Sequence, residues 1–228
     1  MKKTLKLAMA LVIFMVVVGL TGCGGVKQHI RTDADLPNFT KDKIVIMPAS
    51  TWGLPGDKLA QSAALLGGFV AAFGKQGVSL QPLQPVLEKM GMGSMSWRMA
   101  RGMYHMVSFH KTYDFKKDVG YHGSSELPKI IDATAKIISL ASKQLKLKFK
   151  PKYVAVINVD GYGNWYSFGY SKKLRITCGL YNVKTGLVEK VIIKTKSVSS
   201  NEAAILAELA TIGGDMKALL AEAPKAEK

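Results

Sequence analysis

Apolar and polar residues follow two different periods along this 228-residue chain, and the periods separate strand-like from helix-like segments. Compact apolar runs at 43–47, 78–83 and 153–159 are typical of buried strands. At 174–183 and 187–197 apolar and polar residues alternate with the period of two of a half-buried strand. Because only a short turn ending in glycine separates these last two runs, we expect them to form a hairpin.

Most segments between and after the expected strands show the 3.6-residue period of a helix. It predicts helices over 57–75, 127–147 and 201–220, the first and last preceded by side chains suited to N-capping. The pair Gly67-Gly68 predicts close packing of the first helix on the sheet. A further segment, 87–115, is helical but interrupted.

The order strand, helix, strand, helices, strand, hairpin, helix predicts an α/β domain. We expect a mixed β-sheet of about five strands with helices packed on it, over residues 42–222. Residues 1–22 read as a signal peptide. The polar segment 23–41 reads as a flexible tether, and 223–228 as a frayed tail.

The signal-peptide prediction depends on the first two dozen residues. Lys2, Lys3 and Lys6 precede an apolar run at 7–20, which is shorter than the roughly 20 residues that span a bilayer. The quartet Leu20-Thr21-Gly22-Cys23 follows. This arrangement resembles the lipobox of bacterial lipoproteins.

The lipobox resemblance gives Cys23 a role. It implies cleavage before Cys23 and attachment of acyl chains to it, and two such chains suffice for stable membrane anchoring. An Asp after the lipid-bearing cysteine usually retains such proteins at the inner membrane, but Gly24 stands there. The resemblance therefore implies a lipid-anchored protein on the periplasmic face of the outer membrane.

Three segments of the expected sheet resemble a domain shared by several envelope proteins. They are Ile-Val-Ile-Met-Pro at 44–48, Tyr-Val-Ala-Val-Ile at 153–157 and Tyr-Asn-Val-Lys-Thr-Gly at 181–186. They are similar to the amino-terminal domain of the Tol–Pal propeller protein TolB, the curli-export lipoprotein CsgG and lipoprotein activators of penicillin-binding proteins. In that group an Asp usually stands where this chain has Asn182. The resemblance implies an α/β domain in an envelope protein.

The net charge limits the classes of molecule that the protein can bind, and the cysteine content limits its possible disulfides. The formal net charge is +16, of which the signal carries three lysines, so a strongly basic mature chain remains. Such a chain attracts anionic lipid headgroups, acidic glycans or nucleic acid, and export makes nucleic acid an unsuitable partner. With Cys23 lipidated, only Cys178 is left, which excludes an intramolecular disulfide and fits a small buried residue.

A methionine-rich stretch lies in the interrupted helical segment. Met95, Met99 and Met103 are spaced by four residues, so they lie on one helical face together with Met92 and Met106. Core packing is one interpretation of this face, and a pliable docking surface for a partner is another. Thioethers also bind Cu(I), which is a third interpretation.

Glycines and aromatic residues alternate after the expected strand at 153–159. Aromatic rings beside glycines can present flat faces to sugars, peptides or a lipid interface. Covering a sheet edge is the structural alternative. We predict a recognition loop there, with the binding residues Tyr162, Trp165, Tyr166, Phe168 and Tyr170.

Sequence signatures of common enzymes do not occur in the chain. It contains no Gly-x-Ser-x-Gly, no His-Glu-x-x-His and no phosphate-binding loop. Asp160 could act as an acid or base at the end of a strand, but the sequence shows no partner for it. We therefore expect a protein that is not an enzyme and needs no cofactor or metal.

Three functions are compatible with these features. The first is a lipid-anchored, periplasm-facing module that binds or assembles another envelope protein or a peptidoglycan-type cell-wall polymer. The alternative is a carrier of Cu(I) or a small ligand on the methionine-rich helix. The third is an oligomeric pore resembling CsgG, for which the long lipid-facing strands are not evident.

Overall fold

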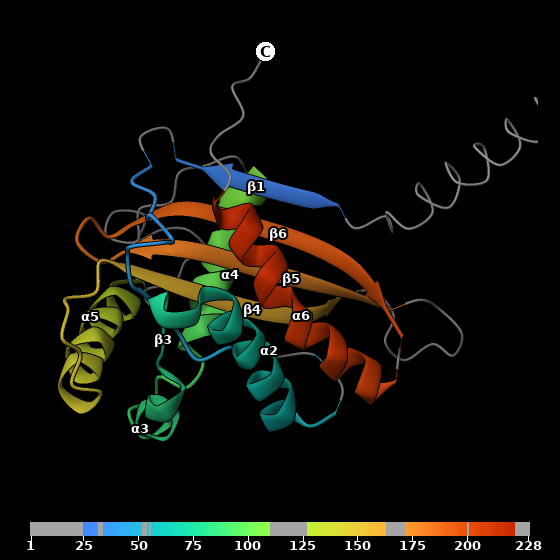
Figure 1. The fold of residues 1–228 in the computed structure, drawn as a ribbon, viewed down its shortest axis with the longest axis horizontal. Helices are drawn as coiled ribbons and strands as arrows, with labels where there is room; N and C mark the ends of the chain where they lie inside the picture. The colour runs from blue at the N-terminus through green and yellow to red at the C-terminus, as the bar shows by residue number, and fades with distance from the viewer. Residues whose placement is uncertain are drawn as a thin grey trace, which may run out of the picture.

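The computed structural model describes residues 25–31, 34–51, 54, 56–109, 127–162, 172–199 and 201–221. Figure 1 shows one twisted sheet with helices around it. The strands are β1 (Val26–Ile30), β2 (Ile44–Ile46), β3 (Gly77–Ser79), β4 (Tyr153–Tyr162), β5 (Lys172–Asn182) and β6 (Leu187–Val198). The helices are α2 (Lys58–Phe73), α3 (Gln84–Lys89), α4 (Met95–Phe109), α5 (Leu127–Gln144) and α6 (Glu202–Ala221), with short 3-10 turns at Gly74–Gln76 and Gln81–Leu83.

The six strands form one mixed sheet in the order β1-β6-β5-β4-β2-β3. β2 runs parallel to both β3 and β4, whereas the pairs β4–β5, β5–β6 and β6–β1 are antiparallel. The predicted α/β class, with helices packed on a mixed sheet, is therefore confirmed. The carboxyl ends of β2, β3 and β4 point in the same direction, which matters for the candidate site below.

The predicted flexible tether over 23–41 is wrong where the structure describes it. Strand β1 lies inside it and pairs with β6 over five residues, which makes β1 the sixth strand. The side chains of β1 are mostly exposed, so the segment has none of the apolar alternation by which a strand is recognised in sequence. Backbone pairing to an existing sheet edge holds it in place instead.

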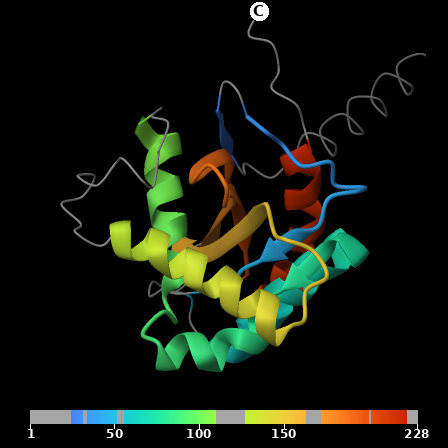
Figure 2. The ribbon, with the colours of Figure 1, turned by 90° about the vertical axis from the view of Figure 1, so that its left-hand side faces the viewer.

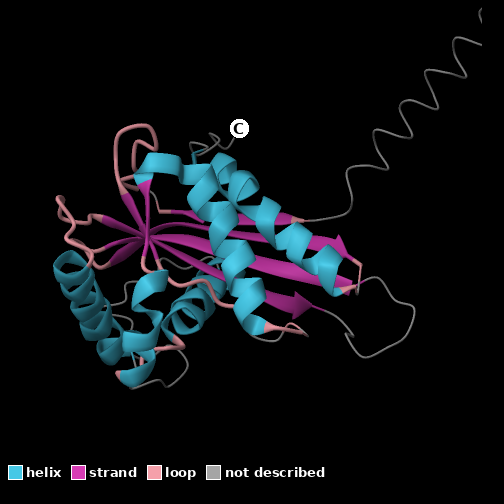
Figure 3. Ribbon diagram, turned by 60° about the horizontal axis from the view of Figure 1, so that its bottom comes forward, coloured by secondary structure: helices cyan, strands magenta, loops and turns pink. Residues whose placement is uncertain are grey.

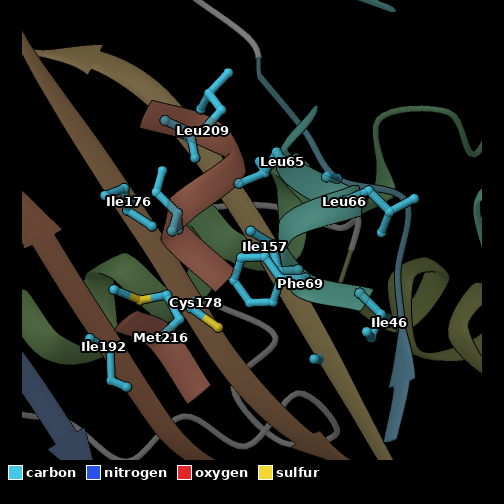
Figure 4. Packing of buried hydrophobic residues seen from close by; sticks show 14 of the residues in the cluster. Ile46, Leu65, Leu66, Phe69, Ile157, Ile176, Cys178, Ile192, Leu209 and Met216 are labelled. Atoms are coloured by element: carbon cyan, nitrogen blue, oxygen red, sulfur yellow. The ribbon is translucent and has the colours of Figure 1, made fainter. Parts of the chain in front are cut away.

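The sheet separates two hydrophobic cores. Residues of β4 alternate between them, with Ala155 and Ile157 on one face and Val154 and Val156 on the other. Figure 2 shows α2 and α6 on one side of the strands and α4 and α5 on the other. Figure 4 shows the first core, in which Phe69 of α2 and Leu209 of α6 lie over Ile157 and Cys178.

Helices α2 and α6 cross at a contact that requires glycine. A Cβ built on Gly68 would overlap the carbonyl group of Ala210, and one on Gly213 would overlap the backbone of Gly68 and Phe69. The glycine pair at 67–68 was expected to pack on the sheet. The structure corrects this, because Gly68 packs on a second helix and a Cβ on Gly67 would meet no atom within 4 Å. Figure 3 shows the two helices side by side over the strands.

The β5–β6 hairpin closes as the sequence predicts. Asn182 accepts hydrogen bonds on its Oδ1 from the backbone N–H groups of Lys184 (3.0 Å) and Thr185 (3.3 Å). Gly186 has φ of 73°, a left-handed conformation that glycine adopts without strain. Among the described helices, none is long and apolar enough to cross a bilayer.

Candidate functional site

A cavity of about 520 Å³, lined by both apolar and polar side chains, opens beyond the carboxyl ends of β2 and β3. In open α/β sheets, ligands commonly bind at this edge of the parallel strands. Its walls come from the segment that follows β2, the first turns of α2 and α4, the 3-10 turn after β3, and α3. The lining residues are Pro48, Ala49, Ser50, Thr51, Lys58, Leu59, Ser62, Gln81, Gln84, Glu88, Gly93 and Ser96.

The segment after β2 is fixed by hydrogen bonds from both neighbouring helices. The Ser62 hydroxyl of α2 donates to the carbonyl oxygen of Ala49 at 2.6 Å, and the Ser96 hydroxyl of α4 donates to that of Pro48. Ser50 continues the parallel pairing, since its N–H donates to the Ile157 carbonyl at 3.2 Å. The cavity wall is therefore held by contacts between distant parts of the chain.

The N-terminus of α2 beside the cavity is already capped. Asp57 accepts hydrogen bonds from the backbone N–H groups of Leu59 (2.8 Å) and Ala60 (3.3 Å). Glu202, at the start of α6, accepts from the Asp57 N–H at 3.0 Å. These carboxylates complement the positive helix end, so a ligand of the cavity is bound by side chains and not by an open helix terminus.

Several hydrogen-bond acceptors lie among the apolar and polar side chains of the cavity walls. A hydroxyl that donates its hydrogen keeps its oxygen lone pairs, so Ser62 and Ser96 still offer acceptors. Gln81 Oε1 is buried and has no hydrogen-bond partner among the described residues. Gln84 donates from Nε2 to Glu88 Oε1 at 2.8 Å. The cavity therefore suits a ligand rich in hydroxyl or amide donors.

One cation and one anion line the cavity together with these groups. They are Lys58, at the start of α2, and Glu88, on α3. The surrounding protein partly desolvates the Lys58 ammonium and lowers its pKa below the usual value. The balance of charges favours a neutral or zwitterionic ligand over a polyanion at this position.

The methionine face predicted from sequence lies on α4. Met95, Met99 and Met103 are buried there and belong to the core between α4 and the sheet. Met103 packs so closely on β5 that a Cβ at Gly179 would overlap its sulfur. Core packing thus accounts for the position of these three side chains, which are not on the surface as a docking role would require.

Two other predicted sites fall outside the described residues. They are the lipidation site Cys23 and the aromatic loop residues Trp165, Tyr166, Phe168 and Tyr170. The backbone of Tyr162 ends β4 and pairs with Lys173 of β5. The recognition role of the loop stays a prediction.

The contacts of Asp160 and Cys178 fit a structural role and not a catalytic one. The Asp160 carboxylate accepts from Arg175 Nε at 2.8 Å and from Asn158 Nδ2 at 3.1 Å. Desolvation raises its pKa, and the Arg175 guanidinium opposes that shift. Burial raises the pKa of the Cys178 thiol to about 12. Within the described ranges, no group of three His, Cys, Asp or Glu side chains is arranged to hold a metal ion.

A buried carboxylate holds the segment that was predicted to be a tether. Glu189 of β6 is fully buried and binds the Arg31 guanidinium through two hydrogen bonds of 2.9 and 2.7 Å. The same oxygen, Oε2, also accepts from the Asp35 N–H at 3.1 Å, and the other oxygen, Oε1, accepts from Asn182 Nδ2 at 3.0 Å. Sequence reasoning missed this network, although a Glu inside an apolar strand was a signal that a partner must exist.

A second contact fixes the same segment a few residues later. The Tyr153 hydroxyl donates to Asp35 Oδ1 at 2.7 Å, and Lys152 pairs with the other oxygen at 2.5 Å. The hydrogen bond from Lys152 is the main cause that lowers the pKa of Asp35. Burial raises the pKa of Tyr153 to about 12.

Comparisons with known proteins give only distant likenesses. No protein-family model and no curated protein matches the chain. Among solved structures, a PelC dodecamer from Paraburkholderia phytofirmans is 11% identical, with a TM-score of 0.46 over 88% of this chain and 99% of that one. A variant PelC dodecamer from the same organism is 13% identical, with a TM-score of 0.41 over 83% and 91% of the two chains. The function must therefore be argued from the residues of this chain.

Proposed function

We propose that this protein is a lipid-anchored envelope lipoprotein that binds another envelope component without transforming it. The component is a cell-wall polymer or an envelope protein, and the cavity is the binding site. The protein resides on the periplasmic face of the outer membrane. The cavity carries this proposal, because it is a preformed hollow with hydroxyl, amide and charged side chains placed among apolar ones.

The sequence before β1 supports the anchoring part of the proposal. The lipobox-like quartet ends at Cys23, and the next position holds Gly24 instead of the Asp that usually retains such lipoproteins at the inner membrane. Acyl chains on Cys23 add roughly 0.8 kcal/mol of membrane affinity for each buried methylene. An anchor of this kind needs no membrane-spanning helix.

The cavity chemistry supports binding over catalysis. Sugar units and peptide stems of cell-wall polymers are rich in hydroxyl and amide N–H groups, which match the acceptors of Ser62, Ser96 and Gln81. Catalysis by acyl transfer would need a nucleophile that donates to a base. The Ser62 and Ser96 hydroxyls instead donate to backbone carbonyls, which cannot accept a proton.

The alternative of a Cu(I) carrier has no structural support. Its proposed ligands, the thioethers of Met95, Met99 and Met103, are packed in an apolar core. An ion there would lose its hydration without gaining charged or imidazole ligands from that core cluster.

Site-specific photo-cross-linking in intact cells tests the proposal. Leu59 lines the cavity and is 75% exposed, so a photo-reactive amino acid at this position reaches any bound component. The matched control is Ala207, which is exposed on α6 and does not line the cavity. We expect one reproducible protein or glycan adduct from position 59 and none from position 207, identified by mass spectrometry. Adducts with bulk lipid alone would contradict the proposal.

A further inference from the structure

Exposed lysines gather at one end of the sheet. This is the end at which β2, β3, β4 and β6 begin and β5 terminates. We call it the basic end and define it by eight exposed lysines: Lys41, Lys43, Lys75, Lys146, Lys148, Lys150, Lys152 and Lys184. In Figure 1 the segment between α5 and β4, which carries four of them before the strand begins, lies at the left-hand end of the strands.

Four of these lysines lie in the segment between α5 and β4, and all four are exposed to solvent. Between α5 and β4, Lys146, Lys148 and Lys150 alternate with half-buried side chains that pack on the core. This alternation leaves every second residue in solvent, as on one face of a strand. The next outward lysine in the series is Lys152, immediately before β4.

Contacts between distant segments bring the remaining lysines to the same end. The Lys43 ammonium lies 5.3 Å from the centre of the Phe149 ring, and the Val183 N–H donates to the Lys152 carbonyl at 2.9 Å. Gln76 Nε2 donates to the Thr40 carbonyl at 3.0 Å. The segments carrying Lys41, Lys75 and Lys184 therefore adjoin the lysines before β4.

Few carboxylates offset this charge. Among the described residues, Lys152 is the one lysine of the eight with a carboxylate within ion-pair distance, that of Asp35. Glu189 is buried and bound by Arg31. Asp42 accepts a hydrogen bond from the Asn38 N–H at 2.7 Å and, with Asp35, is one of two exposed carboxylates in the described part of the segment before β2. The basic end therefore has a large positive excess.

The anchor lies toward the opposite end of the sheet. Gly25 accepts a hydrogen bond from the Thr195 N–H at 3.1 Å, and only Gly24 separates it from Cys23. The chain that follows Cys23 therefore enters the sheet at this end, two residues after the cysteine. We call this the anchor end of the sheet.

The two ends are well separated along the strands. Thr195 lies opposite Arg175, which lies opposite Asp160, and β4 runs from Asp160 back to Tyr153 at the basic end. At about 3.3 Å a residue, this stretch is about 23 Å long. Attraction to headgroups at the anchor is screened within about 8 Å at physiological ionic strength.

We propose that the basic end binds an anionic glycan polymer of the cell envelope, presented away from the bilayer that holds Cys23. This inference rests on the proposed function for its location, and it adds a second, charge-based contact to the cavity. Repeated carboxylate or phosphate groups along a polymer match a row of exposed ammonium groups on separate segments. A compact neutral ligand would not use them.

Four substitutions test the inference on the full mature protein, purified in detergent micelles. The variant Lys146→Gln, Lys148→Gln, Lys150→Gln and Lys184→Gln removes exposed charges that make no ion pair with a described carboxylate. The matched control removes four exposed charges elsewhere, through Lys27→Gln, Lys89→Gln, Lys136→Gln and Lys173→Gln. The probe is a polygalacturonate oligomer, with neutral dextran as the uncharged comparison.

We expect the basic-end variant to bind polygalacturonate at least about tenfold more weakly and with a shallower salt dependence, while the control loses about twofold or less. Equal losses in the two variants would overturn the inference, since total charge and not the basic end would then govern binding. Tighter binding to phosphatidylglycerol vesicles, or to an oligonucleotide of equal charge, would also overturn it. These results do not depend on the cavity, so cross-linking at position 59 decides the proposed function separately.

Discussion

The two ends of the β-sheet carry their positive charges in different ways. At the anchor end, three strand cations pair with carboxylates, although Lys27 and Lys173 are exposed there: Arg175 pairs with Asp160 at 2.8 Å, Lys194 with Asp215 at 2.6 Å and Lys196 with Glu208 at 2.5 Å. At the basic end, eight exposed lysines adjoin few exposed carboxylates. Charge at the anchor end therefore ties α6 and neighbouring strands together, whereas charge at the basic end remains available for a partner.

The two ends also differ in how they hold the N-terminal segment. Next to the anchor, Gly25 is bound to β6 through hydrogen bonds to Thr195. At the basic end, the same segment is held by the buried Glu189 and by Asp35. A buried charge that loses its partner costs several kcal/mol, whereas an exposed ion pair contributes little. The contacts of the buried Glu189 should therefore contribute more to the free energy of unfolding than the exposed pairs at the anchor end.

Removing the anchor produces the largest expected effect. Cys23→Ala deletes the proposed lipid attachment site, and we expect nearly all of the protein to move from the membrane fraction to the soluble fraction while it still folds. Cell fractionation with circular dichroism of the soluble protein measures both outcomes. Cys178→Ala is the control, since it removes the buried cysteine and leaves the lipobox intact. A Cys23→Ala protein that stays on the membrane would show that another surface anchors it.

Breaking the buried pair should destabilise the fold most. Glu189→Ala leaves the Arg31 guanidinium and the Asn182 amide without their partner, and such losses cost about 3–5 kcal/mol of unfolding free energy. Glu208→Ala removes a more exposed partner at the anchor end, where the cost is about 1 kcal/mol or less. Urea denaturation of the two variants measures the difference. Equal losses would mean that the two ends are held alike.

Two lysines on the same strand sharpen the comparison further. Lys190 is fully buried and donates to the carbonyls of Leu219 and Leu220 at the end of α6. Lys190→Met leaves these helix-terminal carbonyls without a charged donor, which costs about 2 kcal/mol. Lys194→Met breaks a partly exposed pair with Asp215 and costs about 1 kcal/mol or less. Thermal unfolding measures the stability of the two variants. A larger loss of stability in Lys194→Met than in Lys190→Met would contradict this prediction.

The smallest expected effect is a difference in pH dependence. The pKa of Asp35 is lowered in the folded state, so the stability that it contributes is present above its unfolded pKa and is lost as pH falls through the folded value. The pKa of Asp160 is raised, so the folded state gains stability as pH falls from that raised value toward the unfolded value near 3.8.

Unfolding measurements between about pH 3 and 6 test these opposite signs. Compared with Asp35→Asn, the wild-type protein should lose its advantage as the pH falls. Compared with Asp160→Asn, it should gain stability over the same range. Parallel curves for the two variants would contradict the assigned shifts.

The fold was largely predictable from the pattern of side chains. β4, the β5–β6 hairpin and helices α2, α5 and α6 each bury an apolar set with the right period, so their periodicity is visible without a partner. β1 was not predictable, because its side chains are mostly exposed and its stability comes from pairing with β6. The methionine face was recognised, but only its burial against β5 decides in favour of core packing.

The candidate site was beyond sequence reasoning. Its walls come from four separate segments, and no two of Ser50, Ser62, Gln81 and Ser96 form a motif. The basic end was equally hidden. The net charge was known, yet the lysines at 41, 75 and 184 join those before β4 only through contacts across the sheet.

By itself, the sequence determined most elements of the α/β domain, and it carries the local pattern from which an export signal and a lipobox cysteine are predicted. These are local properties, set by hydrophobic period, chain length and residue type over short stretches. The tertiary structure alone decided that the supposed tether is the edge of the sheet and that Glu189 pairs with Arg31. It also decided that three strand cations pair with carboxylates at one end, while exposed lysines gather at the other. Such features depend on which distant segments the sheet brings together, and pairing between distant residues leaves no period in the sequence.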